Sequence, residues 1–334
     1  MPKTDSSFLL PEAFYDVRSG QRQFSKFAVG LRAVALLREG ESLLIDAGTS
    51  LTPVAQIVRT LSDLKPNQTH FTIMTHNNAA FGALLDTPAN ARFNVFQTGG
   101  RYDRDLNASF GRQAETAYLG FFPRWVFLGQ NGLVAELGLF CHGNTEELAL
   151  KREIFSMPAW ARVVVSDFTK VGSPGGLLYG DSANLTTNVE ECWLISDDIH
   201  DEKFRGTVRS RRAIEIFETQ IRLLQETYGV RVELVHYTVS DLSQDSPFCS
   251  DPELRLAEGR STKFRIHLTA EDIKSADEWR DECSLGSVDI VFRTTEKPIS
   301  VKVESVDLRW NSRGEPVIAG TLLSERDRAS GRIG

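Results

Sequence analysis

The sequence predicts an α/β protein built on a mostly parallel sheet flanked by helices, followed by a smaller β-rich α+β module. Two observations favour this fold class. Short apolar runs alternate with helical segments between residues 26 and 238, as in parallel sheets covered by helices. Beyond residue 240, alternating strands dominate. We therefore expect an arm at 1–21, a first domain at 22–240, a β-rich module at 241–325 and a tail at 326–334.

Composition excludes several classes of protein. The 334 residues are 41% hydrophobic and 25% charged, as in an ordinary soluble protein. A net charge of −7 argues against a nucleic-acid footprint over the whole chain. No apolar run reaches membrane-spanning length, and the first residues lack the apolar core of a signal peptide. We therefore expect a cytoplasmic protein that does not contact membranes.

The cysteines give no sign of a disulfide framework or a metal site. Cys141, Cys192, Cys249 and Cys283 are scattered and form no C-x-x-C pair, so we expect free thiols, no metal and no cofactor. Cys141 is followed by His142, but neighbours on a strand point to opposite sides. We therefore expect no catalytic role for this pair.

The stretch 43–55 organises the first domain. An apolar run ends in Asp46 and is followed by Gly48, Thr49 and Ser50, which predicts a buried strand that turns sharply into a helix. The N–H groups and hydroxyls of such a turn suit a phosphate, because a helix N-terminus carries partial positive charge. A plain strand-to-helix turn without a ligand is the alternative interpretation.

The other expected elements follow in order. Further strands are predicted at 71–74, 93–96, 125–128, 162–165, 192–198 and 230–236, with helices at 26–38, 54–64, 78–85, after Asn144 and at 209–228. The basic run 209–212 either contacts nucleic acid or is the solvated start of its amphipathic helix, which we favour. In the second module we expect strands at 264–268, 288–292, 299–303 and 317–322, a helix at 270–283 and a hairpin loop at 311–315.

Polar or small residues follow each of five consecutive strands. Because ligands of such folds bind beyond the carboxyl ends of the strands, these residues predict a polar pocket. The candidates are Asp46, Gly48, Thr49, Ser50, Thr75, Asn77, Thr98, Gly99, Gly100, Arg101, Asn131, Asp167 and Lys170. Glu147, three residues after Asn144, either completes a capping box or contacts the ligand.

Several motifs stand in an order that resembles a known family. They are Lys26 with its helix, the segments 40–41 and 44–50, 74–77, 98–100 with 109–111, 127–132, Glu147 with Lys151 and Arg152, 167–170 and 195–197. Together, over about residues 22–238, they resemble the ligand-sensing domain of the DeoR family of bacterial transcriptional regulators. His76 and Asn77 depart from that family's usual Thr-Asn-Ser order.

The resemblance implies both a fold and a ligand. The fold would be shared with ribose-5-phosphate isomerase and coenzyme A transferases, and the pocket would take a phosphorylated sugar or a nucleotide-like metabolite. Gly48, Thr49, Ser50 and Lys170 would hold the phosphate. The rest of the pocket would be lined by Asp46, Asn77, Gly100, Arg101, Asn131 and Asp167.

Two departures shape the functional hypothesis. Only about twenty residues precede Lys26, too few for the family's helix-turn-helix, so we do not expect direct DNA binding. Gln130 and Asn131 stand where the related isomerase has a carboxylate-rich turn, and neither side chain can act as a base. We therefore expect a non-catalytic sensor that signals to an oligomer interface or a partner through its C-terminal module.

Two alternatives stay open. Asp167 with Lys170, or Glu147, leaves room for a sugar-phosphate isomerase or transferase that uses the same pocket. An interaction scaffold with a degenerate pocket is the third possibility.

Overall fold

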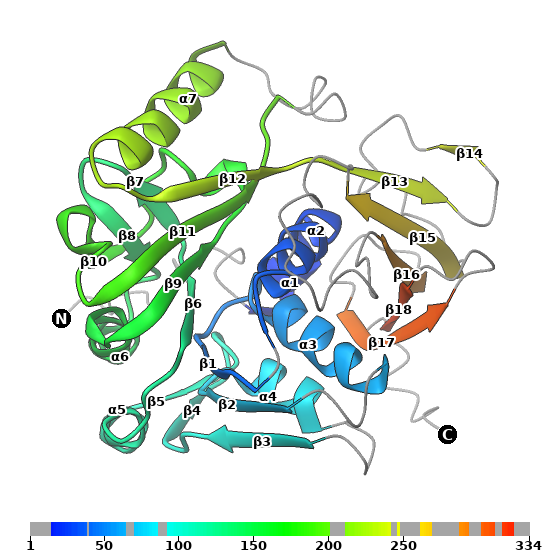
Figure 1. Ribbon diagram of the computed structural model, residues 1–334, viewed down its shortest axis with the longest axis horizontal. Helices are drawn as coiled ribbons and strands as arrows, with labels where there is room; N and C mark the ends of the chain where they lie inside the picture. Colours follow the sequence, from blue (N-terminus) through cyan, green and yellow to red (C-terminus); the bar gives the residue numbers. More distant parts are fainter. Residues whose placement is uncertain are drawn as a thin grey trace, which may run out of the picture.

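The computed structural model describes residues 15–38, 40–64, 70–85, 92–200, 211–241, 246–247, 261–268, 287–293, 302–310 and 316–323. A seven-stranded sheet forms the centre of the first domain, with strand order β12-β11-β9-β6-β1-β2-β3 (Figure 1). Every neighbouring pair in this sheet is parallel. The strands are β1 (Ser42–Ile45), β2 (His70–Thr75), β3 (Arg92–Gln97), β6 (Trp125–Gly129), β9 (Ala159–Val165), β11 (Val189–Asp197) and β12 (Arg231–Val235). The predicted parallel sheet is therefore confirmed.

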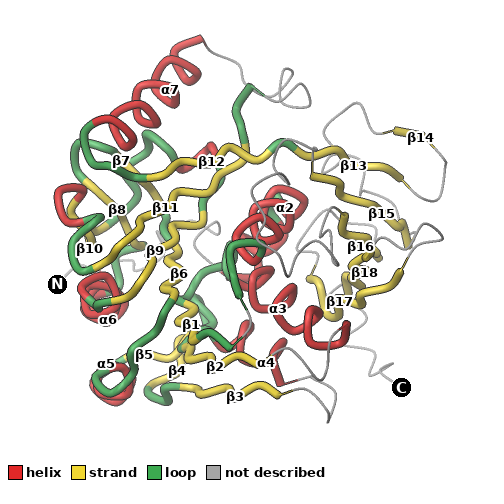
Figure 2. Tube along the Cα trace, viewed as in Figure 1, coloured by secondary structure: helices red, strands yellow, loops and turns green. Residues whose placement is uncertain are grey.

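Helices cover both faces of this sheet, as Figure 2 shows. They are α1 (Tyr15–Gly20), α2 (Gln23–Val34), α3 (Thr52–Leu64), α4 (Asn78–Leu85), α5 (Arg112–Tyr118), α6 (Thr145–Ser156) and α7 (Arg211–Glu226). Leu43 and Ile45 of β1 belong to the apolar core shared with α2 and α3, whereas Leu44 belongs to the core shared with α6 and α7. An apolar run without alternation is what a strand buried on both faces requires.

Small antiparallel elements that the sequence analysis did not predict flank the main sheet. They are a three-stranded sheet of β7 (Gly132–Val134), β8 (Gly138–Cys141) and β10 (Leu177–Asp181), and a hairpin of β4 (Arg101–Asp103) and β5 (Ala108–Phe110). A Cβ on Gly138 would lie 1.9 Å from the carbonyl oxygen of Gly180, so β8 and β10 pair only because this position has no side chain. Short, glycine-containing strands carry too little hydrophobic periodicity to be read from sequence.

A second, six-stranded sheet follows, with order β14-β13-β15-β16-β18-β17. Its strands are β13 (Tyr237–Asp241), β14 (Ser246–Pro247), β15 (Ser261–Leu268), β16 (Ser287–Arg293), β17 (Lys302–Trp310) and β18 (Pro316–Leu323). The strands expected at 264–268, 288–292 and 317–322 are confirmed, and Trp310 pairs with Pro316 across an antiparallel pair. The expected helix at 270–283, the loop 311–315 and the tail 326–334 lie outside the described residues.

Residues 302–303 of the expected strand at 299–303 belong to a described strand, and residues 299–301 lie outside the described residues. The described strand β17 runs from Lys302 to Trp310, with a register shift between Val303 and Ser305. This irregularity breaks the period-2 pattern near the start of the strand, so the apolar alternation beyond it was not recognised.

The helix α2 lies between the two sheets, with β11 on one side and β15 on the other (Figure 1). All twelve of its residues are buried, including Lys26 and Arg32. Arg32 pairs with Glu233 of β12 at 2.5 Å, and only His236 separates β12 from β13 of the second sheet. A helix buried all round therefore links the two halves of the molecule.

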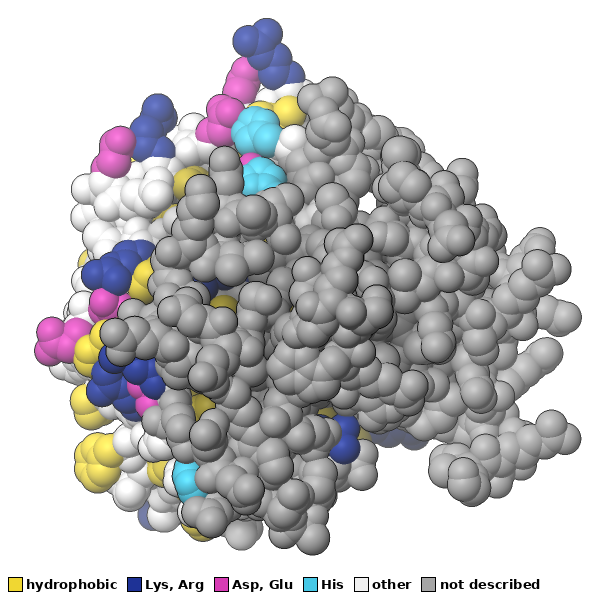
Figure 3. All heavy atoms as spheres, turned by 45° about the vertical axis from the view of Figure 1, so that its right-hand side comes forward, with side chains coloured by type: hydrophobic (Ala, Val, Ile, Leu, Met, Phe, Trp, Pro, Cys, Tyr) yellow, Lys and Arg dark blue, Asp and Glu magenta, His cyan; other side chains and the backbone are white. Residues whose placement is uncertain are grey.

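The described part of the basic run 209–212, at the start of α7, shows the pattern of a solvated surface. The side chain of Arg211 is 93% exposed and forms an i,i+4 ion pair with Glu215 at 3.2 Å. On the face in Figure 3, basic and acidic side chains of the described residues lie next to each other rather than in patches of one sign. Nothing on this described face resembles the positive stripe of a nucleic-acid interface.

Candidate ligand-binding site

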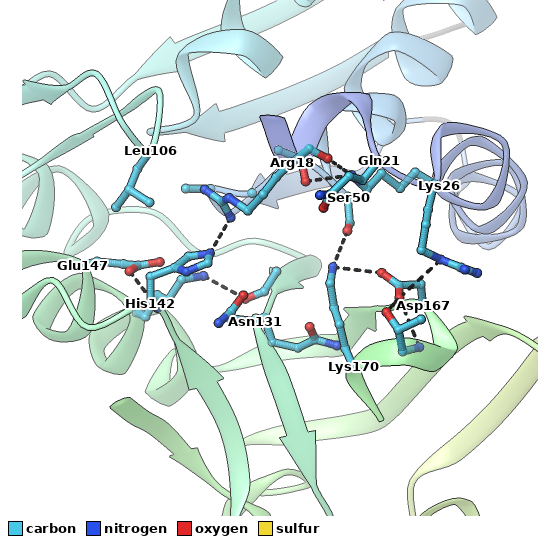
Figure 4. Close-up of a pocket in the computed structure, with 18 residues that line it drawn as sticks. Arg18, Gln21, Lys26, Ser50, Leu106, Asn131, His142, Glu147, Asp167 and Lys170 are labelled. Carbon is cyan, nitrogen blue, oxygen red and sulfur yellow. Dashed lines mark hydrogen bonds and ion pairs between the residues drawn. The ribbon is translucent and has the colours of Figure 1, made fainter. Parts of the chain in front are cut away.

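A cavity of about 510 Å³ lies at the carboxyl ends of β1, β6 and β9, within the range of roughly 300–1,000 Å³ common for small-molecule sites. Segments far apart in the sequence form its walls (Figure 4). It is lined by Arg18, Gln21, Arg22, Lys26, Ala47, Gly48, Thr49, Ser50, Leu106, Gly129, Gln130, Asn131, His142, Glu147, Lys151, Asp167, Thr169 and Lys170.

The loop after β1 forms one wall of the cavity. Gly48 has φ 138°, a backbone region that L side chains rarely adopt, and its carbonyl accepts the N–H of Leu51 at 3.0 Å. This turn places Thr49 and Ser50 against the cavity just before α3 begins. Because the first N–H groups of a helix lack intrahelical partners, this wall suits an anion.

Two lysines meet this wall from other elements. Lys26 of α2 donates from Nζ to Thr49 Oγ1 at 3.0 Å. Lys170, at the end of the 3-10 helix η2 (Phe168–Lys170), donates to Ser50 Oγ at 2.9 Å. We call the part of the cavity bounded by Lys26, Thr49, Ser50 and Lys170 the cationic end (Figure 4).

Asp167 balances the charge of the cationic end. Its Oδ1 accepts the N–H of Thr169 at 3.2 Å and lies 3.5 Å from Nε of Arg22, while Oδ2 lies 3.2 Å from Nζ of Lys170. Burial raises the pKa of this carboxyl, but Lys170 and Arg22 together hold the net pKa well below its ordinary value. A carboxylate in this state is a poor proton acceptor, so its geometry suits charge balance better than general-base catalysis.

Arg22 joins α1 to α2 in an uncommon conformation. It has φ 50° and ψ 43°, in the left-handed region, at the N-cap of α2. Its guanidinium forms an ion pair with Asp197 at the end of β11 and lies 4.3 Å from the ring centroid of Phe168. Non-glycine residues in this region concentrate at functional sites, where the surrounding contacts hold them.

A buried ion pair supports the floor of the cavity. Asp46 pairs with Lys151 of α6, and both side chains are almost fully buried. Asp46 also accepts the N–H of Ala47 at 2.7 Å and that of Gly129 at 3.0 Å, while Lys151 donates to the carbonyl of Gly129 at 2.8 Å. A Cβ on Gly129 would lie 2.5 Å from the carbonyl oxygen of Ala47. Asp46 therefore joins the loops after β1 and β6 from below.

The opposite end of the cavity is built around Glu147. One oxygen of this carboxyl accepts the N–H of His142 at 3.1 Å, and the ring of His142 accepts a hydrogen bond from Arg18. We call the part bounded by Leu106, His142, Glu147 and Lys151 the Glu147 end (Figure 4). Burial raises the pKa of Glu147, and burial together with the charge of Arg18 lowers the pKa of His142 to about 3. His142 is therefore neutral near pH 7.

Asn144 and Cys141 have structural roles beside this end. Asn144 caps α6 by accepting the N–H groups of Glu146 and Glu147. The carboxyl of Glu147 does not return to Asn144, as a capping box would require, but bonds to His142. Burial raises the pKa of the Cys141 thiol to about 11, so this cysteine is not an activated nucleophile.

Half of the predicted site residues line the cavity. These are Gly48, Thr49, Ser50, Asn131, Glu147, Asp167 and Lys170. The predicted residues that lie outside the lining are Asp46, Thr75, Asn77, Thr98, Gly99, Gly100 and Arg101. Asp46 lies directly beneath the cavity, and the other six follow β2 and β3, on the side of the sheet away from β6 and β9.

The residues after β2 bond to the protein itself. Thr75 donates to the carbonyl of Ile45 at 2.6 Å and accepts the N–H of Asn77 at 3.0 Å. Asn77 accepts the N–H of Ala80 at 3.1 Å, which caps α4, and donates to the carbonyl of Gly48 at 3.3 Å. These side chains hold the loop after β1 in place from behind.

The residues after β3 form a tight turn and a surface ion pair. Thr98 donates to the carbonyl of Gly99 at 3.1 Å. A Cβ on Gly100, at φ 110°, would lie 2.5 Å from the carbonyl oxygen of Phe110, so the turn packs against β5. The side chain of Arg101 is 57% exposed and pairs with Glu146.

Other lining residues were not among the predicted site residues. They are Arg18, Gln21, Arg22, Lys26, Ala47, Leu106, Gly129, Gln130, His142, Lys151 and Thr169. Lys26 and Lys151 lie in motifs that carry the family resemblance, and Lys151 follows Glu147 by one helical turn, which places both on one face of α6. Arg18 belongs to α1, and Gln21 and Arg22 form the turn between α1 and α2. This segment precedes β1 and has no strand-end signal.

The described residues offer two negative findings. They contain no cluster of three or more His, Cys, Asp or Glu side chains that could hold a metal ion. None of their helices combines the length and the apolar character that a membrane crossing needs.

The fold and the cavity define an α/β domain with a small-molecule pocket at the carboxyl edge of a parallel sheet. The family model of the DeoR C-terminal sensor domain matches residues 21–191. This chain therefore belongs to the family of DeoR C-terminal sensor domains.

Individual relatives are more distant. Over 166 residues the chain is 26% identical to the "Putative aga operon transcriptional repressor" of Escherichia coli O157:H7, a match that covers 50% of this chain and 57% of that protein. The chain thus spans little more than half the length of this relative.

Solved structures with similar regions include ribose 5-phosphate isomerase A from Methanocaldococcus jannaschii, at 12% identity and TM-score 0.31, over 44% of this chain and 53% of that one. The isomerase from Neisseria gonorrhoeae matches at 13% identity and TM-score 0.29, over 47% and 55% of the two chains.

Proposed function

We propose that this domain senses a phosphorylated sugar or a related phosphorylated metabolite and passes the signal on in the control of transcription. Membership of the DeoR sensor family supports the regulatory role. The single observation that carries the ligand class is the cationic end, where Lys26 and Lys170 converge on the hydroxyls of Thr49 and Ser50 before the N-terminus of α3. Charge-assisted donors at a helix N-terminus favour a phosphate over a neutral group.

The phosphate would sit at the cationic end and replace contacts that the protein makes with itself. Lys170 uses two of its three N–H donors for Ser50 and Asp167, which leaves one for a ligand oxygen. Ligand binding there would act on α2, since Lys26 and Arg22 belong to its first turn and its N-cap. Because α2 lies between the two sheets, the second sheet is our candidate for the surface that meets a second copy or a protein partner.

An isomerase or transferase is the alternative function of the same cavity. Of the two lining carboxyls, Asp167 is held by cations, whereas burial raises the pKa of Glu147 toward the range of a general base. The enzyme hypothesis therefore rests on Glu147. Conversion of a bound aldose phosphate to its ketose, followed by NMR and lost in Glu147→Gln, would establish it in place of the pure sensor.

A titration of matched sugars tests the proposal. Ribose 5-phosphate or glucose 6-phosphate should raise the melting temperature of the full chain, because a ligand that binds the folded state stabilises it, whereas ribose and glucose at equal concentration should not. Calorimetry then gives the affinity. If inorganic phosphate and every phosphorylated compound leave the melting temperature unchanged, the sensor proposal is wrong and a scaffold with a degenerate pocket is favoured.

A further inference from the structure

The two ends of the cavity differ in what they can bind (Figure 4). At the cationic end, Lys26 and Lys170 present ammonium groups to one wall. At the Glu147 end, the ammonium of Lys151 is already neutralised by Asp46. Arg18 also lines this end, where its guanidinium bonds to His142 and interacts electrostatically with Glu147. At the cationic end, Lys26 and Lys170 outnumber the lining carboxylate Asp167. A ligand that spans the cavity therefore meets an excess of positive charge at the cationic end and a balanced set of charges, with the carboxyl of Glu147 among them, at the other.

Glu147 is the unsatisfied polar group of its end. The residue is 4% exposed and lines the cavity. One of its carboxyl oxygens accepts the N–H of His142, and the other accepts no hydrogen bond from the part of the chain that the structure describes. This second oxygen is not among the fully buried polar atoms, and because Glu147 lines the cavity, it can accept a hydrogen bond from a donor on the ligand.

Lys151 offers a complementary donor one helical turn away. Its ammonium donates to Asp46 and to the carbonyl of Gly129, which leaves one N–H. An acceptor and a donor on one face of α6 match a hydroxyl group, which donates to one and accepts from the other. They match a phosphate or a carboxylate poorly, because such an anion has no proton to donate to Glu147.

We propose that this cavity selects phosphomonoesters whose far end is an uncharged polyol, and that Glu147 is the residue that rejects a second anionic group there. The inference rests on the proposed function, since it assumes that the phosphate occupies the cationic end. A second anion would either face the charge of Glu147 in a site with little water or require that Glu147 take up a proton. Both routes weaken binding, and the second makes binding of that anion tighten as the pH falls.

Two matched pairs of compounds test this on the full chain by calorimetry at pH 7.5. Glucose 6-phosphate is compared with 6-phosphogluconate, and fructose 6-phosphate with fructose 1,6-bisphosphate. In each pair the second compound carries an additional anionic group at the far end, a carboxylate in the first pair and a phosphate in the second. We expect it to bind at least tenfold more weakly, and we expect at least one monophosphate to bind at least tenfold more tightly than inorganic phosphate.

The isosteric variant Glu147→Gln assigns the effect to one residue. It should reduce the difference within each pair to less than threefold, mainly by improving the anionic compound. Glu146→Gln is the matched control, because Glu146 is the adjacent residue of α6 but pairs with Arg101 outside the lining of the cavity. It should leave the ratios as they are in the original chain.

The outcomes separate the two proposals. If no phosphorylated compound and no inorganic phosphate binds, the proposed function fails and the inference fails with it. Equal affinities within the pairs, a monophosphate no tighter than phosphate, or ratios unchanged in Glu147→Gln overturn the inference while phosphate sensing stands. Should Glu147→Gln not fold, the affinity ratio within each pair is measured on the original chain at pH 7.5 and at pH 6. This comparison still tests the inference, because only the compound with the anionic far end should bind relatively better at the lower pH.

Discussion

The two halves of the central sheet use the same kind of residue for different purposes. After β1, β6 and β9, small and polar residues such as Ser50, Asn131 and Asp167 line the cavity. After β2 and β3, Thr75, Asn77 and Thr98 bond to backbone groups of the protein itself. Residues of both groups bond to the protein, since Asp167 accepts the N–H of Thr169 just as Asn77 accepts that of Ala80. A polar residue at a strand end is thus a candidate ligand contact only where the strand ends beside the cavity.

The ion pair beneath the cavity gives the largest effect that we expect. Asp46→Asn removes the charge that neutralises Lys151, whose side chain is 3% exposed. Leaving a buried ammonium without its partner should lower the free energy of unfolding by about 3–5 kcal/mol, measured by urea denaturation. The double variant Asp46→Asn with Lys151→Met removes both charges and should recover at least half of the loss. A double variant less stable than Asp46→Asn would show that the pair does not act as a unit.

The half of the sheet without the cavity should contribute its own response to acid. His76, after β2, is fully buried, and its ring lies 2.8 Å from the hydroxyl of Tyr118. Burial lowers the pKa of His76 from 6.5 to about 4, against the opposing effect of Asp46. In the unfolded chain His76 takes up a proton near pH 6.5, whereas in the folded chain it does so only near pH 4. Stability is therefore present above pH 6.5 and is lost as the pH falls between these values.

Over that window the loss should reach up to about 3 kcal/mol for His76, since one pKa unit corresponds to about 1.4 kcal/mol. Urea denaturation at pH 7.5, 6 and 5 measures it. His142, whose pKa is also lowered, adds a loss of the same sign, so the contribution of His76 is the part of the slope that disappears in His76→Gln. His200→Gln, at a histidine with a 46% exposed side chain, serves as the control, and an equal change in both variants would contradict the prediction.

Lys170 lines the cavity, whereas Arg101 lies on the surface, and the two residues should differ in their effect on ligand affinity. Lys170→Met should weaken ribose 5-phosphate binding by about 1.5–3 kcal/mol, the cost of a charge-assisted hydrogen bond. Arg101→Met should leave the affinity within a factor of two, because Arg101 lies outside the lining and pairs with Glu146. Calorimetry on both variants measures the difference. If both variants lost the same affinity, the phosphate site would lie nearer β3 than proposed. The half of the sheet that contains β2 and β3 would then take part in binding.

The sequence predicted the sheet far better than it predicted the site. All strands of the parallel sheet were expected, since apolar runs such as 162–165 between helical segments have no other common explanation. The short strands β7, β8 and β10 were missed, because glycines such as Gly138 leave no periodic signal. The topology rule directed attention to Ser50, Asn131 and Lys170 at strand ends, and these three residues line the cavity. It could not distinguish them from Thr75 and Thr98, because the partners of those hydroxyls are set by backbone geometry.

The cationic residues that come from before β1 show a second limit. Arg18, Arg22 and Lys26 reach the cavity because α2 lies across the sheet between β11 and the second sheet. No local pattern in their segment indicates this packing, and the left-handed conformation of Arg22 is opposite to the usual preference of arginine. Lys26 was recognised only as part of the family resemblance. Such residues become visible only when the tertiary arrangement is known.

The smallest effects come from two threonines at equivalent places in the two halves. Thr98→Val, after β3, should change ligand affinity less than twofold, because Thr98 lies outside the lining and its hydroxyl bonds to the adjacent Gly99 carbonyl. Thr49→Val, after β1, removes the oxygen that accepts from Lys26 at 3.0 Å and should weaken phosphate binding by about 0.5–1.5 kcal/mol, the net value of one hydrogen bond. Both changes keep the size of the side chain, and calorimetry with ribose 5-phosphate measures both. If Thr98→Val weakened binding as much as Thr49→Val, the ligand would reach the β3 side and Thr98 would belong to its site.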